Sequence, residues 1–595
     1  MASTSKNSAG AVTTTVASST AIVAFLASGY FYIRQVRRKS RRYGSLAYLP
    51  NSSDENSASV ITAAVRTAIS RGGVSPSAIS ALSLRGQRAA LPPMPPHWSG
   101  FIRCLQDPCD ATSNPEGYVA LCLAENKLCT ELLATRLMSS GTAVSAFSDS
   151  IVYGYNGFLG LPAAREAVAY LLERRFLFAG QGGWSPPSTS RAGRHRHIQP
   201  IDLERDEPES LLSNDQNGVF AAPDRPQSPG PDPDRVDPEH CALGAGVASL
   251  LSHVMFVLTE LNDAILIPAP YYASFESDLQ ALAACTPFPV YMENPRLGPN
   301  IDDLDRAAAL AEREGLTVKA LLLTNPHDPL GVIYRPQVML NAISWARSRS
   351  MHTVVDEIYA LSVHRRDSGF ESVIRVLNND LGDDVHMLYG LSKDFGASGF
   401  RVGMLYTHNT LLLAALANLN IFSGVSHPIQ MILAELLTDD NFLDGFLDDV
   451  RAQLVWSHAI CTQKLEEMVV PYEVAEAGLF VYVDLSVLLP EPTFEGERKL
   501  ARLIEDAAHI VLTPGEYMRE RKPGHFRICY SWVTPEVLEI AMERLSYLVK
   551  KIRRYGADGL DPKSLRDVTK AGMLMGMRRT PSINLAELTN KKSSP

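Results

Sequence analysis

Short apolar runs alternate with helical patterns through the middle of the chain. Residues 319–324 form a mostly apolar run that ends in a turn, which predicts a buried strand. A helical pattern follows at 337–349, and an apolar run at 353–356 predicts the next strand. Strands separated by helices of this length are typical of parallel βαβ units. We therefore expect an α/β fold with a mostly parallel sheet.

Four further segments extend this pattern. Residues 241–251 predict a strand, a glycine turn and a helix start, and residues 264–273 predict a strand followed by two tyrosines. Apolar runs at 385–389 and 402–406 predict two more strands. The first backbone N–H groups of a helix favour anions, which makes Val247 and Ala248 candidates for a phosphate site. Ordinary βα turns have the same sequence pattern, so this turn alone does not show that the segment binds a phosphate.

A lysine and an arginine stand between the last two predicted strands. Lys393 follows Ser392 after the run 385–389, and Arg401 comes eight residues later. A lysine amine forms a Schiff base with an aldehyde, and an arginine guanidinium pairs with a phosphate. Lys393 and Arg401 together suit a cofactor that carries an aldehyde and a phosphate. The alternative is an ordinary surface turn.

Acidic and aromatic residues favour the cofactor site. Asp356 ends the predicted strand 353–356 and Tyr359 follows it, as Lys393 follows the strand at 385–389. Open α/β sheets bind ligands at the carboxyl ends of their strands. We therefore expect these three side chains to lie close together.

Three motifs occur in a fixed order. They are Asn-Pro-His-Asp-Pro-Leu-Gly at 325–331, Asp-Glu-Ile-Tyr at 356–359, and Ser-Lys-Asp-Phe-Gly-Ala-Ser-Gly-Phe-Arg-Val-Gly at 392–403. The set resembles the class I/II aminotransferases that use pyridoxal 5'-phosphate (PLP). Within them it is most similar to the branch of 1-aminocyclopropane-1-carboxylate (ACC) synthase and its synthase-like relatives. The resemblance covers roughly residues 117–550.

This resemblance implies the α/β fold of PLP-dependent transferases of fold type I. Such a fold has a mostly parallel large-domain sheet flanked by helices, plus a small α/β domain formed by both chain ends. The resemblance also implies a homodimer, because it places the active site at the subunit interface.

The resemblance gives each cofactor residue a role. Lys393 would form the Schiff base and move the α-proton of the substrate, and Asp356 would pair with the protonated ring nitrogen. Tyr359 would donate to the 3′ oxygen of the ring, and these three residues form the predicted catalytic set. The predicted cofactor-binding residues are Val247, Ala248, Tyr272, Asp328, Asp356, Tyr359, Ser392, Lys393 and Arg401.

Three residues are predicted to meet the substrate. Arg527, in a strand-like segment, would take the α-carboxylate of an amino acid in a bidentate pair. Glu125 would lie near the substrate, although it is equally placed as a helix-start residue. Phe158 stands where the family has a tyrosine that crosses from the other subunit, and its ring cannot donate a hydrogen bond.

Two more positions depart from the family pattern. Asp328 replaces an asparagine that contacts the 3′ oxygen, and Gly390 replaces a serine that contacts the phosphate. A carboxylate beside a phenolate is repulsive, so either Asp328 is protonated or the Schiff base keeps its proton to higher pH. Neither change removes the Schiff-base lysine, so we expect cofactor binding to survive.

The N-terminus contains a candidate transmembrane anchor. Residues 11–33 carry no charge, and six basic residues follow within 34–42. Such a length suffices to cross a bilayer, and flanking arginines favour the cytoplasmic side. We expect a membrane-anchored protein with a cytoplasmic catalytic domain. A mitochondrial presequence or a disordered tail on a cytoplasmic enzyme are the alternatives.

Composition divides the remaining chain. The predicted segments are a polar tail (1–10), the anchor (11–33), a basic and then Pro/Ser-rich linker (34–98), the N-terminal part of the small domain (99–150), the large PLP-binding domain (151–425) with a disordered insertion (180–232), the C-terminal part of the small domain (426–550) and a basic disordered tail (551–595).

Charge and cysteine content exclude other classes. The net charge of −9 gives no indication of nucleic-acid binding. The eight cysteines lack the spacing of zinc ligands, so we expect reduced thiols and no metal site.

The predicted function is transamination of an amino acid through the Lys393 Schiff base. A lyase of the ACC synthase type acting on S-adenosylmethionine is the alternative within enzymes. A membrane-tethered PLP-binding protein with little or no turnover is the alternative outside them.

Overall fold

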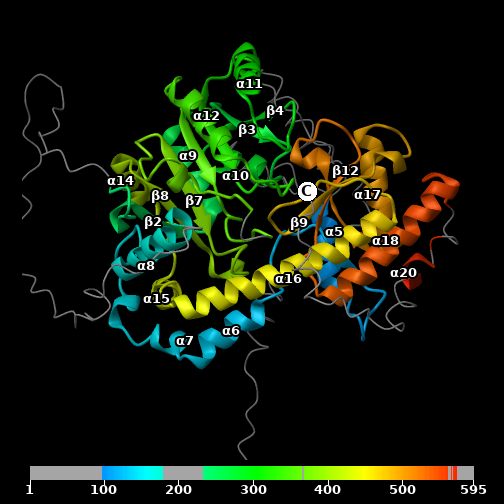
Figure 1. Cartoon of the computed structure of the whole chain (residues 1–595), viewed down its shortest axis with the longest axis horizontal. Coiled ribbons are helices and arrows are strands. Elements are labelled where there is room, and N and C mark those ends of the chain that lie inside the picture. The colour runs from blue at the N-terminus through cyan, green and yellow to red at the C-terminus, as the bar shows by residue number, and fades with distance from the viewer. Residues whose placement is uncertain (1–96, 179–231, 365–367, 561–564, 566, 572–595) are drawn as a thin grey trace, which may run out of the picture. The chain divides into compact units, whose positions relative to one another are not determined.

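The computed structural model describes residues 97–178, 232–364, 368–560, 565 and 567–571 (Figure 1). The predicted anchor at 11–33, most of the linker, nearly all of the insertion and most of the basic tail lie outside these residues. Across the described ranges, every helix is too short or too polar to cross a membrane.

Seven strands form the main sheet, in the order β2-β8-β7-β6-β5-β3-β4 (Figure 1). The strands from β4 to β7 pair in parallel, whereas β8 is antiparallel to both of its neighbours. The prediction of a mostly parallel sheet is confirmed. The strands are β2 (Cys241–Ala245), β3 (Ala264–Ala269), β4 (Thr286–Tyr291), β5 (Val318–Thr324), β6 (His352–Asp356), β7 (Val385–Gly390) and β8 (Val402–Thr407).

Helices cover both faces of this sheet, because alternate strand residues point to opposite sides. Leu322 of β5 belongs to one buried apolar cluster with residues of α9, α10 and α14. Its neighbours Leu321 and Leu323 belong to another, with residues of α8, α11 and α12. These helices are α8 (Pro162–Leu172), α9 (Val247–Leu258), α10 (Phe275–Ala281), α11 (Ile301–Arg313), α12 (Pro336–Arg347) and α14 (Thr410–Leu419).

Segments from both ends of the described chain pack together beside the main sheet. Strand β1 (Val119–Ala120) pairs in parallel with β10 (Ile510–Val511). Three antiparallel strands lie in the order β11-β12-β9, namely β11 (Thr513–Pro514), β12 (His525–Cys529) and β9 (Phe480–Asp484). The fully buried Arg544 donates to the carbonyls of Gly117 and Ala508, which ties these ends to each other. The predicted domain boundaries stay a prediction.

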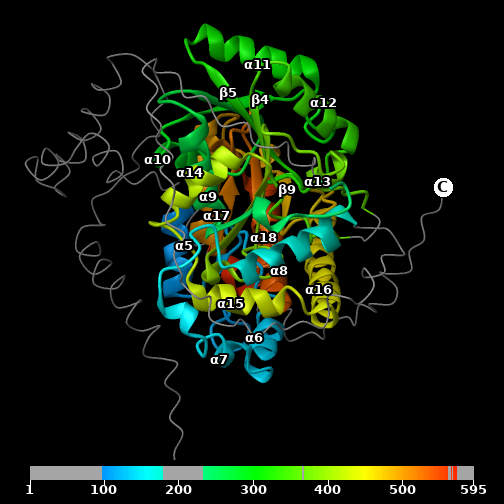
Figure 2. The same ribbon diagram turned by 90° about the vertical axis from the view of Figure 1, so that its left-hand side faces the viewer.

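The remaining helices surround these sheets. Helix α15 lies beside α8, and the long α16 runs beside α18 (Figure 2). They are α5 (His97–Gln106), α6 (Thr130–Ser139), α7 (Thr142–Ser145), α13 (Val373–Val376), α15 (His427–Leu436), α16 (Asp440–Glu467), α17 (Phe494–Ala508), α18 (Pro535–Tyr555) and α20 (Val568–Ala571).

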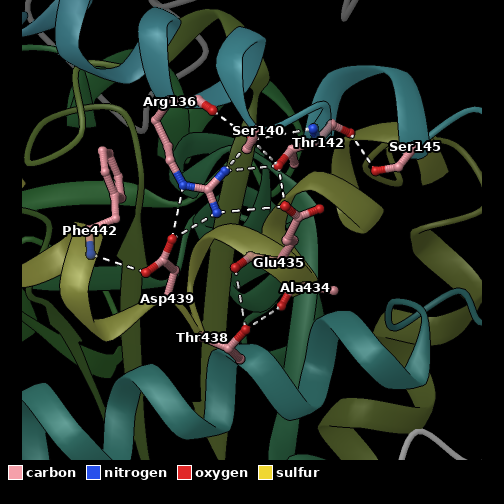
Figure 3. Close-up of polar contacts among 9 residues, drawn as sticks. All are labelled: Arg136, Ser140, Thr142, Ser145, Ala434, Glu435, Thr438, Asp439 and Phe442. Atoms are coloured by element: carbon pink, nitrogen blue, oxygen red, sulfur yellow. Dashed lines mark hydrogen bonds and ion pairs between the residues drawn. The ribbon is translucent and has the colours of Figure 1, made fainter.

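A polar cluster around Arg136 joins four of these helices (Figure 3). The Nε of Arg136, on α6, donates to Asp439 Oδ2 at 3.0 Å, and its Nη1 donates to Thr142 Oγ1 of α7 at 2.9 Å. Thr142 donates in turn to Glu435 of α15. Asp439 also caps α16 by accepting from the backbone N–H of Phe442. The cluster therefore fixes the start of α16 against the N-terminal helices.

Candidate active site

Lys393 lies just after β7, close to two aromatic rings. Its Nζ is 5.9 Å from the ring centroid of Tyr272 and 5.8 Å from that of Tyr359, and it donates to the carbonyl of Ala124. Burial lowers the pKa of Lys393, while the charge of Asp328 acts in the opposite direction. A lowered pKa favours the neutral, nucleophilic form of the amine.

Asp356 ends β6 inside the same cluster. Its side chain is buried and accepts a hydrogen bond from the backbone N–H of Ile358 at 3.1 Å. Burial raises the pKa of Asp356 to about 7, and the hydrogen bond and the charge of Lys393 oppose this rise. The structure therefore brings Lys393, Asp356 and Tyr359 together at the carboxyl ends of parallel strands.

Arg527 and Asp328 form a buried ion pair in this cluster. Arg527 Nη1 lies 2.7 Å from Oδ1 and 2.8 Å from Oδ2 of Asp328, and the hydroxyl of Tyr359 donates to Oδ2 at 2.9 Å. Burial is the largest single influence and would lower the pKa of Arg527, but the charge of Asp328, its hydrogen bond and the nearby Cys529 and Tyr359 together outweigh burial, so the pKa is raised. Sequence reasoning placed both residues at the site and did not include their pairing.

The start of α9 and Arg401 form a cradle beside these groups. Arg401 donates to the carbonyls of Ala245 and Ser398, both at 3.2 Å. A Cβ added to Gly246, the residue before α9, would lie 2.4 Å from Nη2 of Arg401. The first N–H groups of a helix lack partners within it, so Val247 and Ala248 present theirs at the helix start.

Gly390 ends β7, at the position where the resemblance implies a serine. A Cβ there would lie 2.7 Å from the carbonyl oxygen of Val402 and 2.9 Å from the side chain of Val247. The local packing leaves no room for a side chain, which explains the glycine in physical terms.

Two of the other predicted residues, Glu125 and Ser392, lie near Lys393. Glu125 accepts a hydrogen bond from Ser398 Oγ, and its charge raises the pKa of Lys393. Ser392 is partly exposed beside Lys393. Phe158 is on the surface loop before α8, and the residue is 41% exposed.

Comparison with known proteins decides the family. The model of the family described as aminotransferase class I and II matches residues 235–545, just over half of the chain. The chain belongs to this family.

Relatives of the chain include ACC synthase-like protein 1 of Arabidopsis thaliana, which is 29% identical over 468 residues. The ACC synthase of Nicotiana tabacum is 28% identical over 464 residues. Each match covers 76% of this chain and 83% of the relative.

Solved structures show the same fold. A Thermus thermophilus aspartate aminotransferase double mutant has a TM-score of 0.55 at 18% identity, covering 78% of this chain and 98% of that one. A Pyrococcus protein, protein-A1, has a TM-score of 0.58 at 17% identity, covering 79% and 99%. The prediction of fold type I is confirmed, and the chain is a PLP-dependent enzyme of the class I and II family.

The candidate site fits PLP on its own geometry. The cradle at Gly246 would be filled by any side chain, and it combines a helix N-terminus with a guanidinium, which suits a phosphate. Asp356 supplies a buried carboxylate for a ring nitrogen, and Tyr272 and Tyr359 supply aromatic rings near Lys393.

Sequence reasoning missed two buried carboxylates that support the site. Asp394 accepts from Tyr389 Oη at 2.9 Å and from the backbone of Leu361 at 2.8 Å, which fixes the loop that carries Lys393. Glu357 accepts from Ser372 Oγ and from the N–H of Val373, both at 2.6 Å. Each follows a predicted site residue in sequence, and that adjacency is the signal that could have found them.

Proposed function

We propose that this chain is an aminotransferase that moves an amino group with Lys393 as its central residue. The observation that carries the proposal is the position of Lys393 Nζ, 5.9 and 5.8 Å from the rings of Tyr272 and Tyr359 and electrostatically coupled to Asp356. An amine with a lowered pKa, placed among these groups, suits both capture of an aldehyde and proton transfer.

The residues divide this work among them. When bound, PLP withdraws electrons from the carbon that carries the amino group. Lys393 would hold the cofactor through Nζ and, once displaced by the substrate amine, would carry a proton to and from that carbon. Asp356 would keep a ring nitrogen protonated, and Arg401 with the start of α9 would hold the phosphate.

The test uses the full chain incubated with PLP. A visible absorbance band is expected in the wild type and in the control Lys499→Ala, whose lysine is exposed and paired with Glu491. Lys393→Ala is expected to lack the band. The wild type is then incubated with single amino acids, each with a keto acid acceptor. We expect it to transfer the amino group from the amino acid to the keto acid. Absence of any half-reaction with amino acids and with primary amines that lack the carboxylate, despite the band, would favour a PLP-binding protein without turnover.

A lyase of the ACC synthase type is the second candidate. It is favoured by the relatives named as ACC synthases, of which this chain covers 83% at 28–29% identity. Incubation with S-adenosylmethionine separates the two functions. Formation of ACC would support the lyase, and amino-group transfer without ACC would support the aminotransferase.

We also propose that the chain works as a homodimer. Exposed aromatic side chains gather before α8, where Tyr153, Tyr155 and Phe158 are 74%, 95% and 41% exposed. Burial of such side chains against a second copy would be favourable. Sedimentation equilibrium tests this, and a monomer at working concentrations would contradict it.

The segment 11–33 remains our proposed membrane anchor, on the basis of its uncharged composition and the basic residues that follow. Carbonate extraction of membranes from cells that express the full chain tests it. Retention in the membrane pellet is expected, and deletion of residues 1–43 should release the protein.

A further inference from the structure

The Asp328–Arg527 pair occupies the guanidinium that the sequence assigns to a substrate carboxylate. Both oxygens of Asp328 accept from Nη1 of Arg527, at 2.7 and 2.8 Å. Side-chain exposure is 4% for Arg527 and 1% for Asp328. The pair is therefore dry as well as close, which makes it strong and costly to separate.

The other nitrogens of Arg527 are also shielded from solvent, because its side chain is 4% exposed. Its Nη2 donates to the carbonyl of Cys122 at 3.1 Å. Its Nε is buried without a hydrogen-bond partner, and its guanidinium carbon lies 5.3 Å from the ring centroid of Phe480. A carboxylate that entered the site would have to displace Asp328 to pair with Nη1 of this arginine.

Displacement would leave Asp328 in a poor environment. Its second anchor is the hydroxyl of Tyr359, which donates to Oδ2 at 2.9 Å. An incoming carboxylate would add a second negative charge next to Asp328, and one guanidinium cannot neutralise both. Burying an uncompensated charge is strongly unfavourable.

An amine without a carboxylate avoids this conflict. It would displace the amine of Lys393 from the bound cofactor while Asp328 keeps the hydrogen bonds that it accepts from Arg527 and Tyr359. We propose that Asp328 acts as an internal carboxylate that blocks Arg527, so that the site selects primary amines lacking a carboxylate on the amine-bearing carbon. This inference rests on the proposed function and narrows its amino donor, which the resemblance takes to be an amino acid.

The test compares each amino acid with the amine left when its carboxylate is removed. Suitable pairs are alanine and ethylamine, methionine and 3-(methylthio)propylamine, and tyrosine and tyramine. Dissociation constants are measured from the change in the visible band of the PLP-loaded full chain, without reference to turnover. For the pair that binds most tightly, the amine is expected to bind at least about tenfold better than the amino acid.

Two variants identify the cause of the preference. Asp328→Asn frees the guanidinium of a charged partner and is expected to shift the ratio at least about tenfold toward the amino acid. Asp278→Asn is the matched control, because it removes a neighbouring carboxylate whose charge acts on Tyr272 and Asp356. It is expected to leave the ratio unchanged.

The outcomes separate this inference from the proposed function. Tighter binding of the amino acid by the wild type would overturn the inference, while the visible band would still support the cofactor site. This comparison uses only the wild type, so it does not depend on the folding of a variant. An equal shift in Asp278→Asn would also overturn it. Absence of the band in the wild type would overturn both.

Discussion

The guanidinium of Arg401 lies directly against Gly246, so closely that a Cβ on Gly246 would come within 2.4 Å of Nη2. Gly246 has a φ of 88°, which other residues rarely adopt. Gly246→Ala would therefore push Arg401 away and strain the start of α9. We expect the affinity for PLP to fall at least about tenfold, because Arg401 and the start of α9, the two groups proposed to hold the phosphate, both move.

Fluorescence titration of the cofactor-free protein measures this affinity. Gly399→Ala is the control, since a Cβ at Gly399, in the loop before Arg401, meets nothing within 4 Å. Its affinity should match that of the wild type. Equal affinities for wild type and Gly246→Ala would show that Arg401 and the helix start do not hold the phosphate.

Asp394 fixes the loop that carries Lys393. Its oxygens accept from Tyr389, Leu361 and Ser362. Asp394→Leu leaves three donors without an acceptor, at a cost of roughly 1–3 kcal/mol each in the free energy of unfolding. Asp394→Asn should cost far less, because its amide can accept from two of these donors and donate to the hydroxyl of Ser362. Urea denaturation compares the two, and equal losses would contradict a role in accepting hydrogen bonds.

The sequence predicts most of the main sheet because its strands are short and buried on both faces. The expected strand at 319–324 is β5, and the expected helix at 337–349 is α12, with ends displaced by one or two residues. The segment 117–127 contributes only a short strand, which no pattern in the sequence delimits. Only Val119–Ala120 pairs as β1, because the backbone beyond it forms isolated hydrogen bonds and no ladder. The N–H of Lys127, for example, donates to the carbonyl of Ser531.

The local sequence pattern predicts only part of the site. Lys393, Asp356 and Tyr359 come together because each lies at or just after a strand end, which the apolar pattern locates. The pairing of Asp328 with Arg527 joins residues that are 199 positions apart. No local pattern encodes that contact, since it depends on how β12 packs against the turn after β5.

Arg136 offers a test of how the N-terminal helices are held. It contacts Asp439 through two guanidinium nitrogens, at 3.0 and 2.9 Å, and only 14% of its side chain is exposed. Arg136→Ala should lower the free energy of unfolding by roughly 1–3 kcal/mol. A double-mutant cycle with Asp439→Asn, which keeps an oxygen to cap α16, should give a coupling of roughly 0.5–3 kcal/mol. The control is Arg313→Ala, on the exposed face of α11, which should show no coupling to Asp439→Asn. A coupling near zero between Arg136→Ala and Asp439→Asn would contradict the proposed link.

Glu357 gives stability a defined pH dependence. Burial raises its pKa to about 8 from an ordinary 4.5, while hydrogen bonds from Ser372 and Val373 oppose the rise. The folded state therefore holds a proton that the unfolded state has lost. The contribution to stability is complete below about pH 4.5 and is lost as pH rises through about 8. Glu357→Gln should reduce the slope of unfolding free energy against pH by roughly 1 kcal/mol per pH unit between about 5 and 8.

Urea denaturation of the cofactor-free protein across this range measures the slope. Glu495→Gln is the matched control, because a hydrogen bond from Arg498 lowers the pKa of the exposed Glu495. That carboxylate is charged in the folded and unfolded states throughout the window, so its removal should leave the slope unchanged. A wild-type slope that Glu357→Gln does not alter would mean that Glu357 is ionised in the fold. Its charge would then have to be held by the donors of Ser372 and Val373 alone, since burial opposes it.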